Sequence, residues 1–357
     1  MGHFAVYDQL ELNVTILSAL AGYVLSSGGE QVEDLATDLA AESDESVDKA
    51  REAVTITIET LMGVGLIGRD SKWEPPPAVS GSTLERDPGV AVYTGAVQSV
   101  FDQRLAFRSS DQPLLNEIQT WLGIEAIDDA SSAPTVYFDA EPTASGGVDL
   151  TAAEHWGFPD KGGFMVQLPG VINDFAGRLG DMLVLHAGSV RGPDGSVTVL
   201  PGIPEAGKST LTAALIQAGF DYLGDELVGV RSDSLQAVGF PRALALDEIS
   251  RVVLALGAEW ESPYVHVRHV RSDAVAVAGD SGTVERIVLP TFDPNAAAPS
   301  LERIDSARDV LEALLGTAMN LPWVQEPGWV TLCQLAEQVP AYRLRYPDAV
   351  AAANVLN

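Results

Sequence analysis

A glycine-rich stretch in the second half of the chain has the residue types and spacing of a phosphate-binding loop. The pattern G-x-x-x-x-G-K-[ST] is met by Gly202, Ile203, Pro204, Glu205, Ala206, Gly207, Lys208 and Ser209, and Thr210 follows. In such a loop, backbone N–H groups converge on one anion, and the positive end of the next helix adds to them. The glycines permit close approach of the backbone. Lys208 is expected to reach the outer phosphates, and the Ser209 hydroxyl to bind Mg²⁺. The stretch therefore predicts a site for ATP with Mg²⁺.

The surroundings of this stretch are those that a phosphate loop needs. An apolar run predicts a strand over 196–200, and the spacing of Leu211, Leu215 and Ile216 predicts a helix over 210–218. Lysine is scarce in this chain, with 4 Lys against 17 Arg, so a lysine at this position is rarely a coincidence. Glu205 is unusual here because it places a carboxylate in an anion site. The order strand, loop, helix, strand predicts an α/β fold.

Three further polar residues follow or interrupt apolar strands close to the loop in sequence. Asp225 and Glu226 lie 17 and 18 residues after Lys208, in a strand predicted over 222–230. A carboxylate there would hold Mg²⁺ or accept a proton, the alternative being two solvated acids of an acidic protein. His186 ends a strand predicted over 182–186, where it would orient a carboxylate or polarise a phosphate; the alternative is a structural histidine.

These motifs together resemble the kinase domain of HPr kinase/phosphorylase, whose fold is related to phosphoenolpyruvate carboxykinase. The resemblance rests on the stretches 186–189, 202–210 and 218–226. It implies that Lys208 binds the β- and γ-phosphates and that Ser209 binds Mg²⁺. It also implies that Asp225 takes the proton of the acceptor hydroxyl, that Glu226 helps to hold the metal and that His186 hydrogen-bonds the base. In this resemblance, Arg242 would replace a phosphate-stabilising arginine of the family that this sequence has lost.

The first 75 residues predict a small winged-helix domain, with helices over 16–25, 32–39 and 47–61 and a strand after Gly63. They resemble the PqqD-like winged helices, which implies that this module binds a leader peptide. A DNA-binding winged helix is the competing interpretation. Up to Glu74 we count 14 acids and 4 bases, and this negative charge argues against DNA.

The Pro-rich run 75–77 suggests a boundary, after which residues 76–170 are expected to supply edge strands of the phosphate-loop domain, 171–357. In the first of these segments we predict strands over 89–93 and 134–138, a helix over 112–122, and polar loops over 128–133 and 139–149.

The composition excludes several classes of protein. With 50 acids, 21 bases and a net charge of −29, the chain would repel nucleic acids and anionic membranes. A surface adapted to high salt explains this charge. The single cysteine, Cys333, rules out an intrachain disulfide, and its apolar neighbours indicate a core position. Neither a signal peptide nor a transmembrane segment is evident in the sequence, so a cytoplasmic location is expected.

Taken together, the sequence predicts an ATP-dependent kinase that phosphorylates a Ser or Thr hydroxyl on a peptide, a protein or a small molecule. The alternative is an ATP-binding regulator or adaptor of a peptide-modification system that transfers no phosphate. A carboxykinase-like enzyme acting on a small organic acid is a third hypothesis. The acceptor is not specified by the sequence, and a homo-oligomer is compatible with it.

Overall fold

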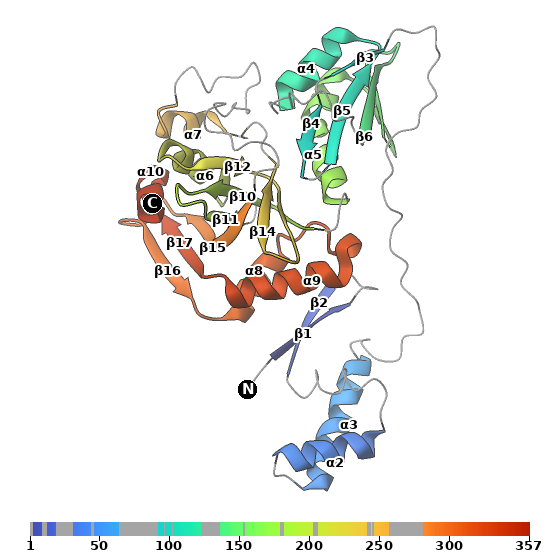
Figure 1. Cartoon of the computed structure of the whole chain (residues 1–357), viewed down its shortest axis with the longest axis vertical. Coiled ribbons are helices and arrows are strands. Elements are labelled where there is room, and N and C mark those ends of the chain that lie inside the picture. The colour runs from blue at the N-terminus through green and yellow to red at the C-terminus, as the bar shows by residue number, and fades with distance from the viewer. Residues whose placement is uncertain are drawn as a thin grey trace. The chain divides into compact units, whose positions relative to one another are not determined.

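The computed structural model divides the chain into two compact units, Met1–Pro76 and Pro77–Asn357, which are described separately (Figure 1). It describes residues 3–8, 13–18, 31–43, 46–63, 92–95, 97–101, 103–122, 136–152, 154–178, 182–202, 206–240, 244, 246–256 and 281–357. No helix among these residues has both the length and the apolar character that crossing a membrane requires.

The N-terminal unit combines a β-hairpin with a pair of helices. Strands β1 (His3–Asp8) and β2 (Asn13–Ser18) are antiparallel. Helices α2 (Val32–Ser43) and α3 (Val47–Gly63) contact each other. Alanines on their facing sides are buried, so the two helices can approach closely: Ala36, Ala40 and Ala50.

The helix predicted over 16–25 is wrong at Ile16, Leu17 and Ser18, which belong to β2. The β-branched residues Val14, Thr15 and Ile16 favour an extended chain, and β1 supplies a pairing partner of equal length. The helices predicted over 32–39 and 47–61 are confirmed by α2 and α3. The strand predicted after Gly63 lies outside the described residues.

The first part of the second unit forms a six-stranded sheet with two helices. The strands follow the order β3-β5-β6-β7-β8, and β4 also pairs with β5. Its elements are β3 (Tyr93–Thr94), β4 (Gln98–Val100), β5 (Gln103–Ser109), α4 (Gln112–Leu122), β6 (Val136–Pro142), β7 (Val148–Thr151), β8 (His155–Phe158) and α5 (Lys161–Arg178). These strands pair with one another and add no edge strand to the second sheet. Helix α4 matches the helix predicted over 112–122.

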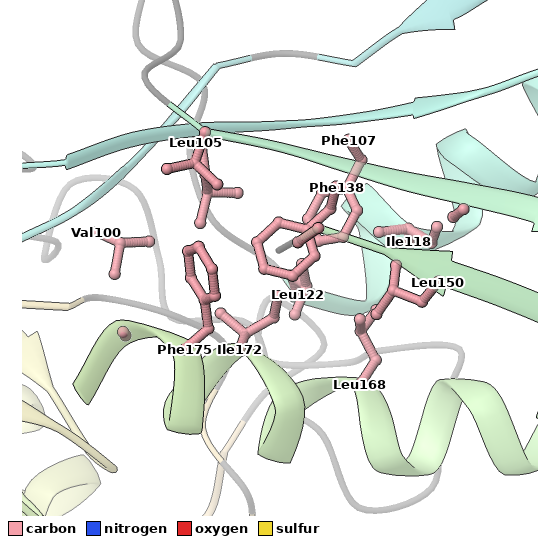
Figure 2. Close-up of a cluster of buried hydrophobic side chains, with 14 of the residues drawn as sticks. Val100, Leu105, Phe107, Ile118, Leu122, Phe138, Leu150, Leu168, Ile172 and Phe175 are labelled. Atoms are coloured by element: carbon pink, nitrogen blue, oxygen red, sulfur yellow. The ribbon is translucent and has the colours of Figure 1, made fainter. Parts of the chain in front are cut away.

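Aromatic and aliphatic side chains fill the space between this sheet and its helices (Figure 2). Phe138 of β6 lies 5.4 Å from Phe107 of β5 and 4.7 Å from Phe175 of α5, measured between ring centroids. Helix α5 presents Leu168, Ile172 and Phe175 to the cluster at helical spacing (Figure 2). The cluster continues into the second sheet, where Phe101 packs against Phe240.

The loop predicted over 139–149 is wrong at both ends, since β6 continues to Pro142 and β7 begins at Val148. Asp139 can lie within β6 because an arginine on the neighbouring strand neutralises its charge. The carboxylate of Asp139 is buried and accepts two hydrogen bonds of 2.7 Å from Arg108 on the neighbouring strand. The Arg108 guanidinium also lies over the ring of Tyr137.

The second part of this unit is built on a nine-stranded mixed sheet. Its main order is β12-β10-β11-β15-β14-β13-β9, while β17 pairs with β15 and β16. The strands are β9 (Leu183–Leu185), β10 (Ala187–Arg191), β11 (Val197–Pro201), β12 (Asp221–Gly224), β13 (Val228–Val230), β14 (Gln236–Gly239), β15 (Ser281–Phe292), β16 (Ser300–Ile304) and β17 (Ala341–Tyr346). The predicted α/β class is therefore confirmed as mixed sheets with helices, and the winged-helix domain remains a prediction.

Among the described residues, five helices accompany this sheet. They are α6 (Lys208–Gln217), α7 (Glu248–Val253), α8 (Ala307–Leu315), α9 (Leu321–Gln338) and α10 (Ala349–Leu356). Helices α6 and α10 contact each other and share one core with side chains of β10, β11, β12, β15 and β17. They therefore cover the same face of the sheet. Cys333 lies in α9, where burial raises the pKa of its thiol.

The strand predicted over 222–230 is divided in two by the structure. Strand β12 ends at Gly224 and pairs with β10, whereas β13 begins at Val228 and pairs with β9 and β14. The chain changes its pairing partners at Asp225 and Glu226, which form a bend. The sequence pattern predicts a continuous strand there, so this prediction is wrong at the bend.

Candidate functional site

Three segments that are distant in sequence meet at one edge of the nine-stranded sheet. Strand β10 is antiparallel to both β11 and β12, so β11 and β12 run in the same direction and their carboxyl ends share an edge. The register pairs Ala187 with Pro201 and Ser189 with Gly224. His186, one residue before β10, therefore lies at the edge where the phosphate loop and the Asp225 bend begin.

Gly207 gives the end of the loop its shape. Its φ of +85° is in the left-handed region, which favours glycine over residues with a Cβ. It precedes the first residue of α6 and, as a glycine, has no side chain with which to cap this helix end. The first N–H groups of a helix have no acceptor within the helix, and an anion suits them. Within the stretch 202–210, the structure describes Gly202 and residues 206–210. Ile203, Pro204, Glu205 and Arg242 lie outside the described residues.

Lys208 is a buried cation, with only 7% of its surface exposed. Its Nζ donates a 2.8 Å hydrogen bond to the carbonyl oxygen of Gly202, at the start of the loop. Burial lowers the pKa of Lys208, and the charges of Asp225 and Glu226 oppose this shift. The lysine and the two acids thus interact across the sheet edge.

Asp225 and Glu226 differ in their environments. Asp225 is 2% exposed, so the alternative of a solvated carboxylate is wrong for this residue. The side chain of Glu226 is 25% exposed. The bend therefore offers one carboxylate within the protein and one that reaches solvent, both next to the phosphate loop.

His186 contacts the second of these acids. Its Nδ1 lies 3.0 Å from the main-chain oxygen of Glu226 and 3.5 Å from the carboxylate Oε2. Because a carbonyl oxygen only accepts, Nδ1 carries a proton and donates to it. The backbone of His186 is held in turn by a 2.7 Å hydrogen bond to the carbonyl of Thr317. The resemblance implies a hydrogen bond from His186 to the base, Asp225, which stays a prediction beside these contacts with Glu226.

The structure places two further residues beside the loop, Tyr346 and Ser250, which no sequence motif singles out. The hydroxyl of Tyr346 donates to the carbonyl oxygen of Gly207 at 3.1 Å. The hydroxyl of Thr210, in the first turn of α6, lies 2.8 Å from that of Ser250 in α7. Residues 341–346 form β17, and nothing in the sequence indicates which element this strand meets.

The residues at this edge fit a nucleotide phosphate with Mg²⁺. Hydroxyl and carboxylate oxygens, available from Ser209, Asp225 and Glu226, are the protein ligands that Mg²⁺ prefers, and it takes its others from phosphate and water. The helix start at Gly207 and the buried Lys208 ammonium suit a phosphate. Among the described residues, no group of three or more His, Cys, Asp or Glu side chains is placed to hold a metal ion.

No model of a protein family matches the sequence, and no curated protein matches it. Among solved structures, the chain is similar to the Hpr(Ser) kinase/phosphatase from Coxiella burnetii, with 15% identity and a TM-score of 0.22. The similarity covers 46% of this chain and 78% of that chain.

Proposed function

We propose that this protein is an ATP-dependent phosphotransferase that acts on a Ser or Thr hydroxyl of a peptide, a protein or a small molecule. The observation that supports it most directly is the position of Lys208. This buried ammonium lies at the end of a phosphate-loop motif and interacts with Asp225 and Glu226 of the bend between β12 and β13. A cation for phosphate and acids for metal and proton are the groups that phosphoryl transfer needs in one place.

In this proposal the loop and α6 bind the phosphates of ATP. The backbone N–H groups at the start of α6 donate to phosphate oxygens, and the helix dipole favours their charge. Lys208 turns from the Gly202 carbonyl to the β- and γ-phosphates, which replace that acceptor. Ser209, Asp225 and Glu226 hold Mg²⁺, which would neutralise charge on the transferred phosphoryl group.

Asp225 is the proposed base. As the acceptor oxygen forms its bond to the γ-phosphorus, the bond from that phosphorus to the departing ADP oxygen breaks. A carboxylate oxygen of Asp225 takes the proton of the acceptor hydroxyl. His186 fixes the bend through the main-chain oxygen of Glu226 and so orients the two acids. The enclosed position of Asp225 keeps water away from the reacting oxygen.

The N-terminal module is proposed to recruit the acceptor when the acceptor is a peptide. This assignment depends on the winged-helix prediction for residues 1–75 and on the resemblance to peptide-binding modules. Removing residues 1–75 should then raise the KM for a peptide acceptor and leave the Kd for Mg-ATP unchanged.

The test is phosphate transfer by the full chain. The protein is incubated with Mg-ATP and candidate Ser- or Thr-containing peptides encoded beside its gene, and mass spectrometry detects the gain of one phosphoryl group. Lys208→Ala should abolish this gain, whereas Lys161→Ala, an exposed lysine of α5, should leave it intact. Transfer that survives Lys208→Ala would contradict the assignment. Tight Mg-ATP binding with neither transfer nor hydrolysis would favour the regulator or adaptor.

A further inference from the structure

The carboxyl end of β17 contacts the phosphate loop through the side chain of Tyr346. Tyr346, the last residue of β17, is buried, and its ring packs edge to face on Phe292 with centroids 6.0 Å apart. Its hydroxyl donates to the carbonyl oxygen of Gly207 at 3.1 Å. Burial raises the pKa of Tyr346 well above its ordinary range, so the hydroxyl keeps its proton at physiological pH.

This hydrogen bond fixes a peptide group that faces the proposed anion site. The Gly207 carbonyl oxygen also accepts from the N–H of Leu211 at 2.9 Å, so both of its lone pairs are occupied. In a trans peptide the C=O and N–H groups point in opposite directions. With the Gly207 oxygen held by Tyr346 and Leu211, the N–H of Lys208 must point back into the loop.

The strand ends also leave no room for this peptide to shift toward them. A Cβ added to Gly207 would collide with the hydroxyl oxygen of Tyr346 and lie 3.4 Å from the Cβ of Phe292. After β17 the chain continues into α10, which contacts α6. The C-terminal segment therefore supports both the end of the loop and the helix that follows it.

We propose that Tyr346 is a positioning residue for phosphate binding, because its hydroxyl orients the Gly207–Lys208 peptide so that the Lys208 N–H faces the anion. This inference rests on the proposed function of the loop. It adds a residue 138 positions beyond Lys208 in the sequence to the phosphate site.

The test compares Tyr346→Phe with Tyr342→Phe, the same chemical change at the other end of β17. Isothermal titration measures the Kd for Mg-ATP and for inorganic triphosphate with Mg²⁺. A lost hydrogen bond of ordinary strength should raise both Kd values about 3- to 10-fold in Tyr346→Phe. Equal effects on the two ligands are expected because the hydroxyl acts on the phosphate cradle, which both ligands share. Tyr342→Phe should match the wild type.

A destabilised control separates positioning from loss of stability. Gly219→Ala strains the backbone at the opposite end of α6, where φ is +98° and no atom crowds the new Cβ. It should reduce the free energy of unfolding and leave both Kd values unchanged. Unchanged Kd values in Tyr346→Phe would overturn the role of Tyr346 without affecting the proposed function. So would a rise of both Kd values in Gly219→Ala that equals the rise in Tyr346→Phe. A wild-type protein that binds neither ligand would overturn the proposed function and this inference with it.

Discussion

The ammonium of Lys208 donates to the carbonyl oxygen of Gly202 at 2.8 Å, so one side chain bridges the phosphate loop from its end to its start. The bond supplies this buried cation with an acceptor inside the protein. It also couples the charge of Lys208 to the shape of the loop. The ammonium has three N–H donors, so a phosphate could add charged acceptors to this neutral carbonyl.

ATP affinity should fall at alkaline pH, and it should begin to fall below the ordinary lysine pKa of 10.5. Burial lowers the pKa of Lys208 in the folded protein, so the free loop loses its positive charge early, while Asp225 and Glu226 limit the shift. The decline should approach tenfold per pH unit at most, because one proton is involved. Titration calorimetry between pH 7 and 10 measures it. Lys208→Arg should abolish the slope, because arginine stays charged throughout.

The same shift predicts the sign of a stability change. Between the lowered pKa of folded Lys208 and 10.5, the unfolded chain binds more protons than the folded one. The contribution of Lys208 to the free energy of unfolding should therefore rise with pH in this window. Urea denaturation of wild type and Lys208→Met isolates this contribution as the difference between two pH profiles. A difference that decreases with pH would contradict the burial of a charged lysine.

Replacing His186 should affect phosphate transfer more than nucleotide binding. His186→Ala removes the side-chain donor to the Glu226 main-chain oxygen and leaves only the longer, 3.3 Å bond from the Ala187 N–H among the described donors, which loosens the bend that carries both acids. We expect kcat to fall about 3- to 10-fold, the effect of one ordinary hydrogen bond, with little change in the Kd for ATP. His186→Asn places an amide donor near the position of Nδ1 and should restore most of the rate. A rise in Kd at constant kcat would assign His186 to nucleotide binding instead.

Alanine should be tolerated less well at Gly207 than at Gly219, although both glycines have positive φ angles. The backbone strain costs about 1–2 kcal/mol at either position. At Gly207 the new Cβ also meets the Tyr346 hydroxyl, which adds about 1–3 kcal/mol of overpacking. Denaturation of both variants gives the difference. Tyr346→Phe in the Gly207→Ala background should recover part of the additional loss, and equal losses at the two glycines would refute the close contact.

The Arg108–Asp139 ion pair should contribute strongly to the stability of the six-stranded sheet. Arg108→Met leaves the buried Asp139 carboxylate without its two 2.7 Å hydrogen bonds and should cost about 3–5 kcal/mol. Asp139→Asn should cost less, because the Arg108 side chain is 20% exposed and can be hydrated. Arg308→Met, which removes the exposed pair with Glu312, should stay within error of the wild type. Thermal denaturation of the three variants tests this order.

The sequence by itself determined the parts whose signal is local. The phosphate-loop pattern, the helix over 112–122 and the helices α2 and α3 depend on spacing within one segment, and hydrophobic periodicity reports such spacing directly. The strand pattern over 222–230 was local too, but it predicted one continuous strand and did not indicate the bend at Asp225. A bend is set by which strands pair on either side of it, and the pairing of β12 with β10 and of β13 with β9 involves residues far away in the chain.

Only the tertiary structure decided which chemical groups meet. The sequence contains Tyr346 as one of 8 tyrosines, with no local feature that links it to Gly207. The parallel pairing of β11 with β15 and of β15 with β17 brings its hydroxyl to the loop. The burial of Asp225, the exposure of Glu226 and the contact of His186 with Glu226 are likewise products of strand order. Residue spacing can specify the chemistry that a segment offers, but the distances between segments follow from how the whole sheet is assembled.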